Sequence, residues 1–189
     1  GGPDGKKAVV RSDLGTILLH WTLVVAIVTS LVTGLRLSAD AEGAWFSKLF
    51  EPILPQGEIW TWHYLSAVFV LALIFAYAAY MSAARLKRRI SSKKVVVVYL
   101  NACNKLRIAA ETVIAYWVLY GAVMTLTATG VLLYLGHGGL WVTVHYISAL
   151  TVMGYIVAHV VLHYFYGGIA QLLRLFRPQP LRYFTGMGR

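Results

Sequence analysis

The chain has 189 residues, of which 59% are hydrophobic and only 13% are charged, and its mean hydropathy is +0.67. A soluble domain carries about 25% charged residues, so this composition excludes an ordinary soluble protein. The formal net charge is +10. The single cysteine, Cys103, excludes a disulfide framework, a CxxC metal or redox site and the attachment motif of a c-type haem within this sequence.

Four apolar stretches follow one another, each long enough to cross a bilayer core, which takes about 20 helical residues. We predict spans at 16–37, 60–81, 108–134 and 140–166. An acidic segment, 38–59, separates the first two spans, a basic segment, 82–107, precedes the third, and a glycine turn at 136–139 joins the last two. The predicted fold is a single all-α domain, 1–189, forming an integral membrane four-helix bundle.

The distribution of basic residues predicts how the bundle is oriented. Of the 17 Lys and Arg residues, 15 lie in the N-terminal arm, in 82–107 or in the C-terminal tail, and only Arg36 and Lys48 lie opposite. Basic loops stay in the cytoplasm, so both termini are predicted to be cytoplasmic, and we expect no nucleic acid partner. The first stretch exceeds the 7–15 apolar residues of a secretory signal, so we expect it to be retained as a span.

Five of the six histidines lie in or beside the predicted spans. Ionisable side chains at membrane depth are costly and mark functional sites. Because successive spans run in opposite directions, His63 and His145 share the outer depth, and His20 shares the inner depth with His159 or His163. Two bis-histidine haems stacked in a four-helix bundle require such pairs. The alternative for any one histidine is a neutral imidazole hydrogen-bonded to a neighbouring helix.

The spacing within the fourth span is compatible with two layers. From His145 to His159 is 14 residues, a rise of about 21 Å that leaves the two side chains about 40° apart on one helix face. His163 lies 18 residues after His145, which is about five whole turns. Rotation therefore allows either residue, whereas depth favours His159, and His163 stays the alternative. Iron held by two imidazoles has no open position, so the expected role is electron transfer.

The histidine layout is similar to that of the bacterial cytochrome b561/Ni-hydrogenase cytochrome b superfamily. The resemblance rests on His20-Trp21, on His63 at the start of the second span and on the pair His145-x13-His159. It extends over nearly the whole chain. It implies a dihaem membrane cytochrome b in a bacterial inner membrane, with His63 and His145 holding the outer haem b and His20 and His159 the inner one.

A second set of residues resembles the gamma subunit of membrane-bound formate dehydrogenases. The run 100–105 reads Leu-Asn-Ala-Cys-Asn-Lys, and Thr129-Gly130 follows late in the third span. Cys103 and Asn104 stand where that family has glycine and glutamine. The resemblance implies a quinone site, for ubiquinone or menaquinone, beside the inner haem.

Asn101, Asn104 and His159 would form that quinone site by resemblance. Glu111, about two turns further along the helix, could bring protons from the cytoplasm, although the two asparagines could simply cap the incoming helix. The implied function is to pass electrons from the iron–sulfur and catalytic subunits of an extracytoplasmic dehydrogenase to quinone.

Three other functions compete with this one. The same scaffold could serve a Ni–Fe hydrogenase or another molybdenum enzyme. It could also be a stand-alone superoxide:quinone oxidoreductase of the small b561 type, which would need no partner subunit. A haem-free membrane anchor or transporter with structural histidines would be colourless.

Overall fold

A computed structural model describes residues 12–41, 43–83 and 104–178 of the chain. Within them lie four long helices, and each contains an apolar stretch long enough to cross a membrane. They are α1 (Leu14–Ala39), α3 (Ile59–Ala83), α5 (Asn104–Tyr134) and α6 (Leu140–Leu172). The predicted all-α membrane four-helix bundle is confirmed.

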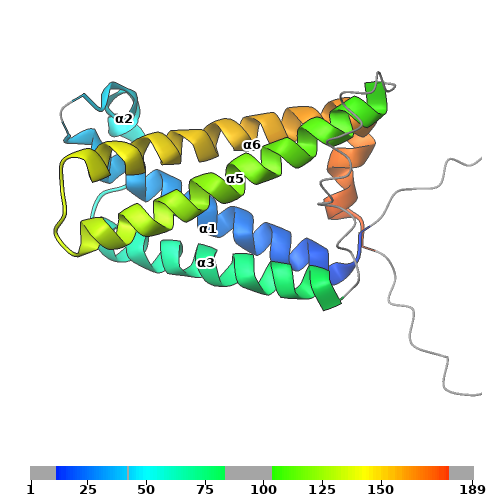
Figure 1. Ribbon diagram of the computed structural model, residues 1–189, viewed down its shortest axis with the longest axis horizontal. Helices are drawn as coiled ribbons and strands as arrows, with labels where there is room; N and C mark the ends of the chain where they lie inside the picture. The colour runs from blue at the N-terminus through cyan, green and yellow to red at the C-terminus, as the bar shows by residue number, and fades with distance from the viewer. Residues whose placement is uncertain (1–11, 42, 84–103, 179–189) are drawn as a thin grey trace, which may run out of the picture.

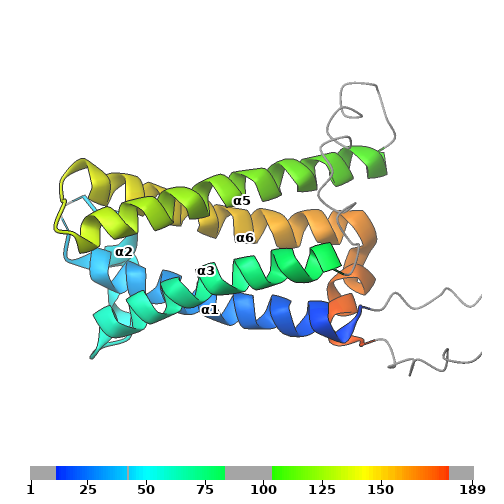
Figure 2. The same ribbon diagram turned by 60° about the horizontal axis from the view of Figure 1, so that its bottom comes forward.

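The four helices form two antiparallel hairpins (Figures 1 and 2). Helix α1 packs along α3, and α5 packs along α6, whereas the hairpins contact each other chiefly through α1 and α6. Apolar side chains cover the outside: Val25, Phe69 and Val157 are each at least half exposed. A lipid environment tolerates such a surface, whereas water would not over this area.

The two ends of the bundle differ. At one, called the α2 end, lie the short helix α2 (Trp45–Phe50), the 3₁₀ turn η1 (Glu51–Ile53) and the turn 135–139 between α5 and α6 (Figure 1). At the other, called the terminal end, Ser12 and Pro178 form a parallel backbone bridge, in which the Ser12 amide donates to the Arg177 carbonyl over 3.2 Å. The two described ends of the chain therefore lie at the same end of the bundle, as four antiparallel spans require.

Helix α1 starts at a capping residue that also ties it to α3. The Asp13 carboxylate accepts hydrogen bonds from the Thr16 amide at 2.8 Å, from the Thr16 hydroxyl at 2.9 Å and from the Tyr80 hydroxyl. Burial alone would raise the pKa of Asp13, but these hydrogen bonds together hold it below its usual value. Gly15 permits the contact, because a Cβ atom there would lie 2.6 Å from the Tyr80 ring.

Helix α6 bends sharply at two glycines. Gly167 has φ −153° and ψ 17°, and Gly168 has φ 63°, in the left-handed region that favours glycine. The straight part of α6 therefore ends where the fourth span was predicted to end, at residue 166. Beyond the bend, residues 169–176, here called the return segment, cross the terminal end of the bundle (Figure 1) and end in η4 (Leu173–Phe176).

Candidate functional site

The histidines of the spans lie in two layers. Near the α2 end, His63 of α3 faces His145 of α6, with ring centroids 6.3 Å apart and ring planes at 73°. Near the terminal end, His20 of α1 faces His159 of α6, again at 6.3 Å, with planes at 28°. All four side chains are half-buried. The structure thus brings together the residues of each predicted pair, and each pair joins the two hairpins.

The common separation of 6.3 Å has a chemical meaning. A metal–imidazole bond is about 2 Å long, and the ring centre lies about 1.2 Å beyond the bonded nitrogen, so two imidazoles on opposite sides of one iron have centroids about 6.4 Å apart. Both pairs match this value. Each could therefore hold a haem iron between the hairpins. An iron held by both imidazoles of a pair would be suited to electron transfer, because the two histidines would leave no position for a substrate.

The α2-end histidine of α3 is fixed by groups from α1. His63 Nδ1 lies 3.1 Å from the Ser30 carbonyl oxygen and 3.1 Å from the Thr33 hydroxyl oxygen. The Thr33 hydroxyl donates its own proton to the Thr29 carbonyl at 2.7 Å, so its oxygen can accept. The proton therefore sits on Nδ1 of His63, and Nε2 keeps the lone pair that a metal requires.

The same arrangement recurs on the other hairpin. His145 Nδ1 lies 2.8 Å from the Thr129 hydroxyl, which donates to the Thr125 carbonyl at 2.7 Å. The Thr129 hydroxyl also lies 3.3 Å from the Leu126 carbonyl, as the Thr33 hydroxyl lies 3.1 Å from the Ser30 carbonyl. Thr129 is only 2% exposed, so its hydroxyl has no competing water. Nε2 of His145 is thereby also left free for a metal.

A glycine follows each of the two threonines and lets the imidazole approach the helix backbone. A Cβ atom on Gly34 would lie 3.1 Å from His63 Cε1, and one on Gly130 would lie 3.5 Å from His145 Cε1. Thr33 and Gly34 were not predicted from the sequence. A signal was present, because the dipeptide Thr-Gly occurs late in both the first and the third span, at the depth of a histidine in the following span.

The terminal-end pair has different surroundings. His159 Nδ1 lies 3.1 Å from the hydroxyl of Tyr155, one turn earlier on α6. The Tyr116 ring packs against His159 with a centroid distance of 5.9 Å, and the His163 ring meets it edge-on at 4.4 Å. His20 contacts the Trp21 ring at 5.8 Å. The ring that faces His20 is that of His159, and His163 lies beside it.

The residues expected to bind quinone are only partly described. Asn101 lies outside the described residues, and of Asn104 the structure describes the backbone, as the first residue of α5. Glu111 is half-buried on α5, about two turns further along. The quinone site therefore stays a prediction. His137, the histidine without a predicted partner, is exposed in the turn at the α2 end.

The chain is similar to a known family of proteins. A family model described as "Prokaryotic cytochrome b561" matches residues 11–178, which is most of the chain. No curated protein and no solved structure matches. A match of this extent, on a bundle of four membrane-length helices, indicates a multi-pass bacterial membrane protein that binds haem b and transfers electrons.

Proposed function

The chain belongs to the prokaryotic cytochrome b561 family, and from that premise we propose that it is a dihaem cytochrome b subunit. It would anchor an extracytoplasmic dehydrogenase to the membrane and pass the electrons of that enzyme across the bilayer to quinone. The proposal refines the family's electron-transfer role in three respects: the number of haems, the partner and the acceptor. Each rests on different residues.

Two haem sites are supported by the two histidine pairs. His63 and His145 would ligate one iron near the α2 end, and His20 and His159 would ligate a second near the terminal end. The matching separations of 6.3 Å carry this assignment. Bound haem supplies a one-electron redox couple. The protein supplies fixed imidazoles: Thr33, Thr129 and Tyr155 each hydrogen-bond to one ring at Nδ1, so that Nε2 is the nitrogen that would bind the metal.

The axial spacing of the pairs supports transfer across the membrane. His145 and His159 lie 14 residues apart on one continuous helix, or about 21 Å, while the hydrocarbon core is about 30 Å thick. One site would therefore be reached from each surface. By the charge distribution of the sequence, the α2 end faces outward and the terminal end faces the cytoplasm.

The α2 end is suited to receive a partner. Trp45 and Leu49 of α2 are 72% and 68% exposed, and Ile53 of η1 is 79% exposed. We assign this surface to the iron–sulfur subunit of a formate dehydrogenase-like enzyme, with Ni–Fe hydrogenase and other molybdenum enzymes as alternative donors. Purification in mild detergent tests the assignment, because the chain should co-elute with an iron–sulfur protein. A chain that elutes alone and reduces quinone with superoxide would contradict it.

The terminal end is suited to an exchange of electrons with quinone. Quinone reduction needs hydrogen-bonding groups and a source of protons near the electron donor. Tyr155 and Tyr116 lie around His159, and by resemblance Asn101, Asn104 and Glu111 complete the site. Protons taken from the cytoplasm at this end, with electrons arriving from outside, would make the reaction charge-separating.

Haem quantification tests the dihaem assignment. The purified chain should contain about two b-type haems per polypeptide, and His63→Ala should contain about one, because a haem with one axial ligand removed is held weakly. His137→Ala is the matched control and should keep both, since His137 is exposed in a turn. A folded wild-type chain with fewer than two haems would refute the assignment.

A further inference from the structure

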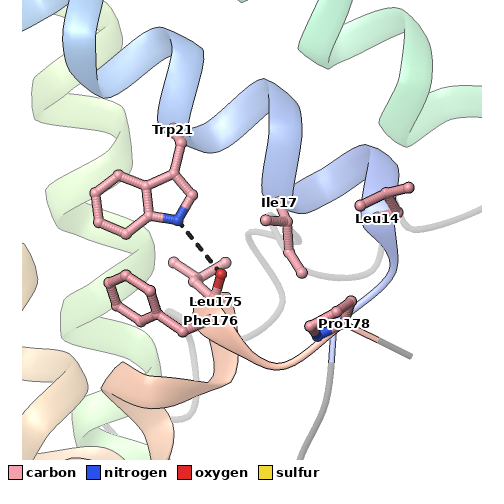
Figure 3. A pocket seen from close by; sticks show the side chains of 6 residues that line it. All are labelled: Leu14, Ile17, Trp21, Leu175, Phe176 and Pro178. Atoms are coloured by element: carbon pink, nitrogen blue, oxygen red, sulfur yellow. Dashed lines mark hydrogen bonds between the residues drawn. The ribbon is translucent and has the colours of Figure 1, made fainter. Parts of the chain in front are cut away.

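The return segment holds an arginine close to the terminal-end histidines. The indole of Trp21 donates to the Leu175 carbonyl over 3.3 Å and packs at a tilt against the Phe176 ring, with centroids 4.9 Å apart (Figure 3). These contacts line an apolar pocket together with Leu14, Ile17 and Pro178 (Figure 3). The backbone directly after Arg174 is therefore fixed against α1, at Trp21, the residue that follows His20.

One hydrogen-bond donor of Arg174 has no partner within the described part of the chain. Its Nε atom is buried and has no hydrogen-bond partner there. The ion pair found among the described residues, Arg36 with Asp40 at 3.5 Å, lies at the opposite end of the bundle. A buried donor without an acceptor is unfavourable, and such a group in a native fold calls for a missing partner.

The position of Arg174 indicates where that partner would be. Arg174 belongs to η4, which directly follows the helix that carries His159 and His163, whose rings are 4.4 Å apart. Through Leu175 and Trp21 the same segment is attached next to His20. Arg174 thus lies at the terminal end of the bundle, near His20 and His159. Its segment follows α6 in the chain and is attached to α1.

We propose that Arg174 binds a propionate carboxylate of the inner haem, an inference that rests on the dihaem function proposed above. Haem b carries two propionates, and a guanidinium pairs with a carboxylate through two parallel charge-assisted hydrogen bonds. The Nε–H of Arg174 would be one of the two donors. The bend at Gly168 then has a purpose, because it turns the chain back so that Arg174 meets the cofactor.

A redox titration followed by optical spectroscopy tests the proposal. Removing a positive charge beside a haem disfavours the ferrous form, in which the site carries one positive charge fewer. Arg174→Gln should therefore lower the midpoint potential of one haem only. That haem should be the one missing in His20→Ala. Arg174→Lys, which keeps the charge but not the paired donors, should shift the potential less.

Arg177→Gln is the matched control, because Arg177 lies three residues further on, is exposed and uses its backbone in the bridge to Ser12. It should leave both potentials unchanged. The proposal is wrong if Arg174→Gln retains two haems at wild-type potentials, or if Arg177→Gln shifts the same haem equally. Unchanged potentials with loss of co-purified anionic phospholipid would assign Arg174 to a lipid phosphate instead. A wild-type chain without an inner haem would instead refute the proposed function itself.

Discussion

The two histidine pairs share a separation but differ in how their rings are held. At the α2 end, each ring is fixed by a buried threonine from the other helix of its hairpin, and each lies against a glycine. At the terminal end, His159 is held by Tyr155 from its own helix, with Tyr116 and His163 around it. A relay that only passes electrons benefits from the first arrangement, whereas a site that also exchanges protons with quinone needs polar groups like those of the second.

The largest effect should come from removing a ligand at the terminal end, where two histidines lie next to each other. His159→Ala should lose one of the two haems, because the ring facing His20 is removed. His163→Ala should keep both haems and change only the potential of the inner one. Haem content per polypeptide distinguishes the variants, and the opposite pattern would make His163 the ligand.

A bulkier side chain in place of the glycine that contacts His63 should cause nearly as much loss of haem. Gly34→Val would place carbon atoms where His63 approaches the backbone of α1, since even a Cβ would lie 3.1 Å from Cε1. We expect loss of most of the outer haem and retention of the inner one. Gly121→Val is the control, because a Cβ there meets nothing within 4 Å. Equal loss in both variants would indicate a general effect on helix packing.

Removing the threonine hydroxyls should weaken the outer site without abolishing it. Thr129→Val leaves Nδ1 of His145 without the hydroxyl that accepts its hydrogen bond and should reduce outer-haem affinity by about 10- to 100-fold. It should also raise the potential of that haem, because the imidazole becomes a poorer electron donor. Thr33→Val should act in the same direction but less, since the Ser30 carbonyl still accepts from His63. Optical redox titration and haem retention during dialysis measure both effects, and a shift in the inner haem would contradict the assignment.

The smallest change should follow removal of the Tyr155 hydroxyl. Tyr155→Phe deletes a hydrogen bond of 3.1 Å to His159 and keeps the ring. Both haems should be retained, with a modest upward shift confined to the inner potential. If quinone reduction takes place at this end, its rate should fall further than the shift in potential explains. A shift in the potential of the outer haem instead would mean that Tyr155 and His159 belong to the outer haem.

The spans and the histidine pairs could be predicted because they depend on local rules. Apolar length locates a membrane helix, and alternating direction sorts His20, His63 and His145 by depth. The contacts of the two Thr-Gly dipeptides with His63 and His145 could not be predicted in the same way, because they depend on which helix faces meet, such as those of α1 and α3. The return segment was missed for another reason: residues 169–176 are as apolar as the span before them, and only the backbone of Gly167 and Gly168 shows that the chain turns.

Low-temperature EPR spectroscopy of the oxidised protein tests the central claim, two bis-histidine haems in two layers, most directly. We predict two low-spin ferric signals of equal intensity, with no high-spin signal. The ring planes at 73° in the outer pair and 28° in the inner pair should give the outer haem the larger maximum g value, because crossed imidazole planes increase the anisotropy. His63→Ala should remove that signal alone. A single low-spin signal, or a stoichiometric high-spin signal from an iron with an open position, would contradict the account.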